Sequence, residues 1–340
     1  MNGTQNQASC KDIFEKRGEK ALEEAKAIIL ASEYDNGLIA SALKYFAKKT
    51  MNKALPVFPA LTSLSCEAVG GDPKKTSEIS AALTLIAGAA DIHDDIIDKS
   101  ISKYSRKTVF GKYGEEIGLL AGDALLIQGM TLLNESKLLL ESQKSQVLKE
   151  LFNSFMKISK AEALEVELRK SSSISPKKYL QLIELKSSVP EMHCRIGALM
   201  GAADDLNINE MGKFGRIFGF VSLILEEFAD MYDFEEFQRR IENECPPLPF
   251  LYALESEKAK NELTRTFSKK VLNPDDFQRY LHITFESKGV RHLLKKMENS
   301  INSELVEIDF IADKKIRAEA SKLFSELLEA VEDYETLAVS

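Results

Sequence analysis

Three aspartates close an apolar stretch of the chain, LTLIAGAADIHDDIID, which runs from Leu83 to Asp98. On a helix, Asp94 and Asp98 stand one turn apart on the same face, with Asp95 beside them. Like charges held so close favour a bound cation, and carboxylate oxygens suit Mg²⁺, which also contacts substrate phosphates. The alternative is a solvated helix face. Three preceding turns of small apolar residues favour instead a core helix whose acids face a cavity.

A second acidic cluster follows the apolar run GFVSLIL and consists of Glu226, Glu227 and Asp230. Its outer members are again four residues apart, which places them on one helix face. We predict that Glu226 and Asp230 are metal ligands opposite the first cluster. A solvated helix end is the alternative, because further acids follow at once in the sequence.

A lysine stands at a predicted helix break. Lys186 precedes Ser187 and Ser188, whose hydroxyls can satisfy freed carbonyls, and Pro190 follows. A cation at such a break is able to reach a bound anion. Exposure at an ordinary helix end is the alternative reading of Lys186.

The elements that must position these residues all read as helices. Apolar residues recur at helical spacing, and no stretch alternates as a half-buried strand does. We predict helices over residues 77–100, 114–138, 142–170, 176–204, 208–233, 247–269, 274–285, 287–306 and 313–337. This pattern predicts an all-α, single-domain antiparallel bundle with a central cavity over residues 12–340, preceded by a disordered N-terminus over residues 1–11.

Composition excludes several classes of function. The 53 acidic and 45 basic residues give a net charge of -8, which argues against a nucleic-acid partner. We identify no membrane span and no signal-peptide core. The 4 cysteines are scattered without a Cys-x-x-Cys pair, which fits a reducing, cytoplasmic setting.

The motif Asp94-Asp95-Ile96-Ile97-Asp98 resembles the first aspartate-rich motif of the trans-isoprenyl diphosphate synthases, the polyprenyl synthetase family. Three further stretches fit the family in order and spacing: residues 112–126, 179–188 and 214–230. The resemblance implies the isoprenoid synthase type of helical bundle, Mg²⁺ as the cofactor, a prenyl diphosphate substrate and a homodimer.

The resemblance also implies roles for single residues. Asp94, Asp98 and Lys186 are expected to carry the ionisation of the allylic diphosphate, and Lys103, Arg106 and Lys186 to bind it. The expected metal ligands are Asp94, Asp95, Asp98, Glu226 and Asp230. The second motif departs from the family's aspartates, because Glu226 and Glu227 stand where the family carries Asp.

The positions that hold isopentenyl diphosphate in the family have lost their charge. They read Asn52, Leu55, Ala87 and Tyr104 in this chain. Since uncharged side chains hold a diphosphate poorly, we interpret the condensing site as dismantled and the ionising site as retained.

This interpretation predicts a class I terpene synthase or lyase, which ionises a prenyl diphosphate of roughly fifteen to twenty carbons or more. The ionised chain would then cyclise or eliminate. One alternative is a chain-elongating prenyltransferase that binds isopentenyl diphosphate through other residues. A second is a non-catalytic partner subunit of an active synthase, against which the intact first motif argues.

Overall fold

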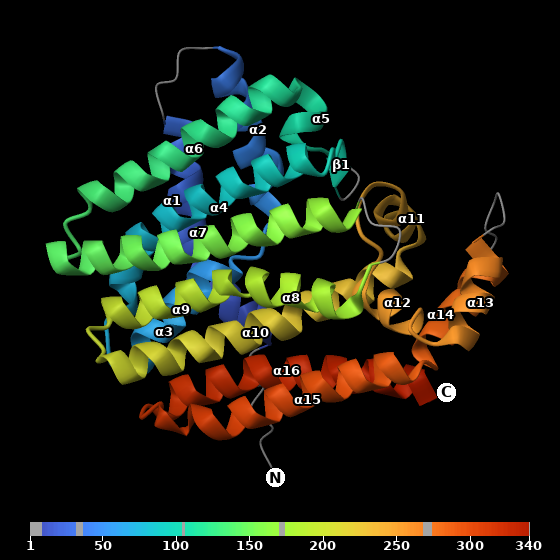
Figure 1. Ribbon diagram of the computed structural model, residues 1–340. Coiled ribbons are helices and arrows are strands. Elements are labelled where there is room, and N and C mark those ends of the chain that lie inside the picture. Colours follow the sequence, from blue (N-terminus) through green and yellow to red (C-terminus); the bar gives the residue numbers. More distant parts are fainter. Residues whose placement is uncertain (1–8, 32–36, 104–105, 170–173, 268–273, 340) are drawn as a thin grey trace, which may run out of the picture. The chain divides into compact units, whose positions relative to one another are not determined.

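The computed structural model describes residues 9–31, 37–103, 106–169, 174–267 and 274–339, and these are almost entirely helical (Figure 1). The all-α prediction is confirmed. The chain divides into two compact units, which are described separately below. The first comprises residues 1–151, 192–212 and 311–316, and the second comprises residues 152–191, 213–310 and 317–340.

The first unit contains the aspartate motif near the end of a long helix. In chain order, its elements are α1 (Cys10–Ala31), α2 (Leu38–Lys49), η1 (Met51–Lys53), α3 (Val57–Ala68), η2 (Pro73–Thr76), α4 (Ser77–Ile97), β1 (Ser102–Lys103), β2 (Arg106–Lys107), α5 (Val109–Tyr113) and α6 (Glu115–Glu135), followed by the first residues of α7 (Glu141–Arg169). Residues 192–200 of α9 (Ser188–Met200) also belong to it.

Helices α4 and α6 lie against each other at close range. A Cβ on Gly129 of α6 would stand only 2.8 Å from the carbonyl oxygen of Ala82 on α4, so no larger residue fits there without a shift. Leu85, Ile92 and Leu125 bury the remaining surface between the two helices in a core cluster. This packing fixes the direction of α4 and therefore the position of its acidic end.

A two-stranded hairpin follows α4, although the sequence predicted no strand. Ser102 pairs with Lys107 and Lys103 with Arg106, in antiparallel register. With only two residues in each strand, the hairpin is too short to show the alternation from which strands are predicted. It is nevertheless important for the site, because it carries Lys103 back to the end of α4.

The second unit contains the other acidic cluster. Its elements are the remainder of α7, α8 (Pro176–Lys186), residues 188–191 of α9, the larger part of α10 (Asp205–Tyr232), α11 (Phe234–Asn243), α12 (Leu248–Ala253), α13 (Glu257–Phe267), α14 (Pro274–Phe285), α15 (Lys288–Glu307), η3 (Ile308–Phe310) and most of α16 (Lys314–Val339).

Two predicted helices are each divided in the structure. The run 176–204 is interrupted at Ser187, which is the break predicted from Lys186 and Pro190, and the run 247–269 is interrupted between α12 and α13, where no break was predicted. Helix α11 was not predicted. It begins after Asp233, whose carboxylate caps it by accepting a hydrogen bond from the N–H of Glu236 (3.1 Å).

Candidate active site

The aspartate motif lies at the C-terminal end of α4. The N–H of Asp98 donates to the carbonyl of Asp94 (2.9 Å), and the N–H of Ser100 donates to that of Asp95 (2.8 Å). Lys99 takes a left-handed conformation between them (φ 53°), which ends the helix in a Schellman motif. The C-terminal end of a helix carries partial negative charge, so a cluster of carboxylates there is electrostatically unfavourable without a cation.

The hairpin supplies one cation to this cluster. The ammonium of Lys103 lies 2.9 Å from Asp95, 3.4 Å from Asp94 and 3.6 Å from Asp91. The Lys103 side chain is 34% exposed, so the ammonium stands at the edge of the protein rather than inside it. Lys103 was predicted to bind the substrate, and the structure places it directly beside the first motif.

Burial and charge perturb the protonation of this group. Burial raises the pKa of Asp95 to about 6, although the Lys103 ammonium opposes the shift. Burial also raises the pKa of Asp91. For Lys103, burial alone would lower the pKa, but the three carboxylates together raise it above its usual value. The lysine is therefore charged at neutral pH and partly compensates the acids.

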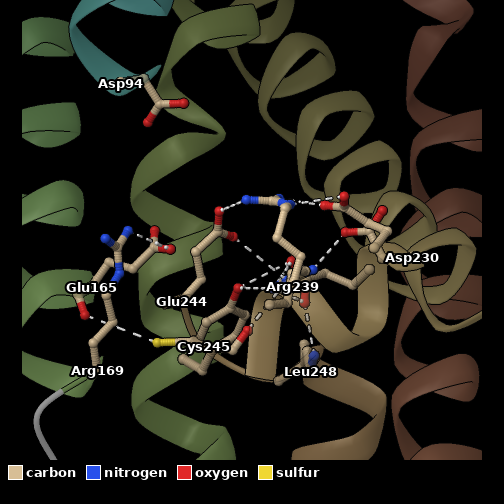
Figure 2. Close-up of polar contacts among 12 residues, drawn as sticks. Asp94, Glu165, Arg169, Asp230, Arg239, Glu244, Cys245 and Leu248 are labelled. Atoms are coloured by element: carbon tan, nitrogen blue, oxygen red, sulfur yellow. Dashed lines mark hydrogen bonds and ion pairs between the residues drawn. The ribbon is translucent and has the colours of Figure 1, made fainter. Parts of the chain in front are cut away.

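The second acidic cluster lies at the end of α10, in the second unit. Here a buried arginine of α11 reaches the carboxylates. Arg240 donates from Nη1 to Asp230 (2.6 Å), and its Nη2 lies 3.0 Å from Glu227. The Arg240 side chain is only 5% exposed. Figure 2 shows the polar network around Asp230, Glu244 and Cys245.

Glu227, which was not among the predicted metal ligands, is held by three groups of the protein. Its carboxylate accepts hydrogen bonds from the hydroxyl of Tyr179 (3.1 Å), the N–H of Leu248 (2.7 Å) and the guanidinium of Arg240 (3.0 Å). Glu226, by contrast, is exposed and makes no hydrogen bond or ion pair with the residues that the structure describes. Although the Glu226 side chain is open to solvent on one side, desolvation by the protein around it and the charges of Asp230 and Glu227 raise its pKa.

Lys186 ends α8 at the predicted break. Its ammonium lies 2.8 Å from Glu165 and 3.0 Å from Glu162, two acids of α7. Glu165 also accepts from Arg169 (3.3 Å). Despite burial, which acts in the opposite direction, Lys186 and the two arginines Arg169 and Arg240 lower the pKa of Glu165. The role of Lys186 in substrate binding stays a prediction.

Two cations approach the end of α2, where the sequence suggested that charge had been lost. Lys26 of α1 is 7% exposed and donates to the side chains of Asn52 (3.3 Å) and Glu23 (2.7 Å). Arg106 of β2 donates to the carbonyl of Lys49. Tyr104, another of the substituted positions, lies outside the described residues.

The donor chemistry of the first motif fits Mg²⁺. Its side-chain donor atoms are carboxylate oxygens, and the half-buried Lys103 is shared by Asp94 and Asp95. Among the described residues, no three His, Cys, Asp or Glu side chains already converge on a point that could hold a metal ion. Mg²⁺ commonly binds through one or two carboxylates together with substrate phosphates, so a preformed cage is not required.

Four residues that contact the predicted site residues were given no role from the sequence. They are Asp91 in the first unit and Glu162, Glu165 and Arg240 in the second. The arginine stands in the polar stretch FQRRIEN, and its acidic partners Asp230 and Glu227 lie ten and thirteen residues away in the sequence. The predicted approach of the two acidic motifs concerns both units and stays a prediction.

Comparison with known proteins identifies relatives over most of the chain. The model of the polyprenyl synthetase family matches residues 41–284. A short chain isoprenyl diphosphate synthase of Methanothermobacter thermautotrophicus is 28% identical over 183 residues, which are 52% of this chain and 54% of the relative. A geranylgeranyl diphosphate synthase of Methanosarcina mazei is 29% identical over 52% of this chain and 55% of its own. The chain thus spans about half the length of these curated relatives.

Solved structures match over a longer stretch. Geranylgeranyl pyrophosphate synthetase from Pyrococcus horikoshii has a TM-score of 0.82 at 20% identity and covers 94% of this chain and 98% of its own. The geranylgeranyl pyrophosphate synthetase of the archaeon Geoglobus acetivorans has a TM-score of 0.81 at 19% identity and covers 93% of this chain and 99% of its own. At this identity the likeness shows the fold, and it confirms the predicted isoprenoid synthase type of bundle.

Proposed function

Because the chain belongs to the polyprenyl synthetase family, we propose that it is a chain-elongating prenyl diphosphate synthase. Such an enzyme joins an allylic prenyl diphosphate to isopentenyl diphosphate and releases diphosphate. The observation that carries the proposal is the acidic end of α4, where Asp94, Asp95 and Asp98 are retained within a matched family region. The curated relatives, which are named as isoprenyl or geranylgeranyl diphosphate synthases, support the same activity.

The sequence-based interpretation as a terpene synthase or lyase is wrong. The relatives are named as isoprenyl or geranylgeranyl diphosphate synthases, and these names support the chain-elongating alternative rather than the terpene synthase. The error came from counting charge only at aligned positions. Lys26, which reaches this region from α1, does not appear in that count, and Arg106 was assigned to the allylic diphosphate instead.

We assign the binding site of isopentenyl diphosphate, the second substrate, to the junction of α2 and η1. Lys26 is bonded to Asn52 there, and Arg106 is bonded to the carbonyl of Lys49 three residues earlier. Charge-assisted hydrogen bonds from an ammonium and a guanidinium suit a diphosphate. On this view Lys26 and Arg106 supply the charge that Asn52 and Leu55 lack.

In the proposed reaction, the chain's own groups position the leaving diphosphate and screen its charge. Bound Mg²⁺ would neutralise the diphosphate as the allylic carbon–oxygen bond breaks. Lys103 would turn from the aspartates toward the phosphate oxygens, which its exposed position permits. Lys186 would share its ammonium between Glu165 and the diphosphate.

A homodimer in the cytoplasm remains part of the proposal. Helix α6 is, among the described helices, the one long and apolar enough to cross a bilayer, a property it shares with core helices of soluble proteins. It exposes Leu119, Leu120 and Ile127, which are 50%, 53% and 64% exposed. Such an apolar face supports contact with a second copy of the chain.

The proposal is tested by the dependence of diphosphate release on the second substrate. Purified protein is incubated with Mg²⁺ and a fifteen- or twenty-carbon allylic diphosphate, with and without isopentenyl diphosphate, and released diphosphate is measured. We expect release to require isopentenyl diphosphate. Equal release of diphosphate without isopentenyl diphosphate, accompanied by an extractable hydrocarbon, would contradict elongation.

The Lys26→Met variant should raise the KM for isopentenyl diphosphate and leave the KM for the allylic substrate unchanged.

A further inference from the structure

The second acidic cluster contains a cation that belongs to the protein. The guanidinium of Arg240 uses nearly all of its donors within the second unit. Nη1 donates to Asp230 (2.6 Å), Nη2 to Glu227 (3.0 Å) and to the hydroxyl of Tyr179 (2.6 Å), and Nε to the carbonyl of Cys245 (3.2 Å). A planar guanidinium held at this many points has one orientation.

The carboxylate oxygens that face Arg240 already accept hydrogen bonds from the protein. One oxygen of Glu227 accepts from Tyr179, and the other accepts from the N–H of Leu248 as well as from Arg240. The Oδ2 atom of Asp230 accepts from Arg240. A metal ion at Glu227 would have to share oxygens that already accept three hydrogen bonds, one of them from a buried guanidinium.

We propose that Arg240 is the permanent counter-ion of the second acidic cluster, taking the place of a divalent ion held by Glu227 and Asp230. Glu226, which pairs with no cation among the described residues, is then the carboxylate of the cluster that receives a metal ion bound with the substrate. This inference rests on the proposed function for the role of that metal. It differs from the sequence-based prediction, in which Asp230 is a metal ligand.

The cation of the first motif, Lys103, is displaced more easily than Arg240 is. Lys103 is a point charge on a flexible stem and is 34% exposed, so it is able to leave the aspartates when a metal arrives. Arg240 is 5% exposed and fixed by a hydroxyl and a carbonyl in addition to the acids. Displacing it would leave a buried guanidinium without its carboxylates, which is strongly unfavourable.

The first test removes the resident cation. In the Arg240→Met variant, Glu227 and Asp230 lose their counter-ion, and a divalent ion becomes the substitute. We expect the variant to unfold at lower temperature than wild type without divalent ions and to recover with Mg²⁺ far more than wild type does. The matched control is Arg239→Met, because Arg239 pairs with Glu236 and Glu244 instead. An equal Mg²⁺ response of wild type and Arg240→Met would overturn the proposal.

The second test keeps Arg240 and therefore holds even if its variant does not fold. Mn²⁺ binding is measured by electron paramagnetic resonance on the full chain with inorganic diphosphate and without prenyl substrate. Glu226→Gln should weaken Mn²⁺ binding by at least about tenfold, and Asp230→Asn should change it by less than about twofold. An equal loss in both variants would overturn the proposal. Because no turnover is measured, this outcome is independent of whether the protein elongates prenyl chains.

Discussion

At the scale of single residues, the first motif breaks a local rule of helix electrostatics. Asp94, Asp95 and Asp98 crowd the negative end of α4, and its last turn contains no basic residue. Residues that violate local preferences without local compensation are typical of functional sites. Their types and spacing were sufficient to find this motif in the sequence. Lys103 was also found, but its contact with Asp91 was not, because the hairpin that creates the contact is too short to predict.

The Asp94→Asn variant tests the role of this motif. Replacing one carboxylate with an amide of the same shape removes a negative charge that would hold the metal–diphosphate group. We expect turnover to fall at least about a hundredfold, with little change in thermal stability. The measurement is the Mg²⁺-dependent rate of diphosphate release. Asp309→Asn on the surface is the control, and equal rates for the two variants would remove Asp94 from the mechanism.

A buried histidine gives a second prediction at this scale. His193 is 1% exposed, and its Nδ1 lies 3.1 Å from the hydroxyl of Thr62. Because that hydroxyl donates to the carbonyl of Phe58, Nδ1 must carry the proton and donate to Thr62. Burial lowers the pKa of His193 to about 3.

The sign of the resulting pH dependence follows from this shift. The unfolded chain takes up a proton below the usual histidine pKa, whereas the folded chain does so only near 3. Stability contributed by neutral His193 is therefore present at pH 7 and falls by roughly 1.4 kcal/mol per pH unit below about 6.5. Urea unfolding of wild type and His193→Gln at pH 7 and pH 5 measures it. The difference in free energy of unfolding between the two proteins should be smaller at pH 5 than at pH 7. An equal difference at both pH values would refute the assignment.

At the scale of elements, helical periodicity predicted most helices to within a few residues. It failed between α12 and α13, where the sequence has no proline or glycine, and at α11, a short polar helix stabilised by contacts distant in sequence. Arg240 lies on that unpredicted helix. The second cluster's counter-ion was therefore missed together with the element that carries it.

The end of α4 provides the prediction for this scale. Lys99 has a φ of 53°, which is unfavourable for a side chain with a Cβ and favourable for glycine. We expect Lys99→Gly to raise the free energy of unfolding by about 1 kcal/mol. Lys99→Ala is the matched control, since it removes the same charge but keeps the strain. If both variants have equal stability in urea, the left-handed cap does not limit the stability of α4.

At the scale of the whole molecule, family membership was predictable because four motifs occur in order along the chain. The proposed reaction was not predicted from the sequence, since a substrate site can be rebuilt from cations on other elements.

The proposed homodimer gives the prediction at the scale of the whole molecule. Replacing Leu120 and Ile127 of α6 by Glu should convert a dimer into a monomer in light scattering, because the charges would be buried unpaired. A mass that is the same before and after the change would place the interface elsewhere.

The most direct test of the account is formation of the new carbon–carbon bond. The protein is incubated with Mg²⁺, an allylic prenyl diphosphate and carbon-labelled isopentenyl diphosphate, and the label is followed into products separated by charge and chain length. The account predicts that label appears in a longer prenyl diphosphate, and that this transfer is lost in Asp94→Asn. Label that stays in isopentenyl diphosphate while the allylic substrate is consumed would contradict chain elongation.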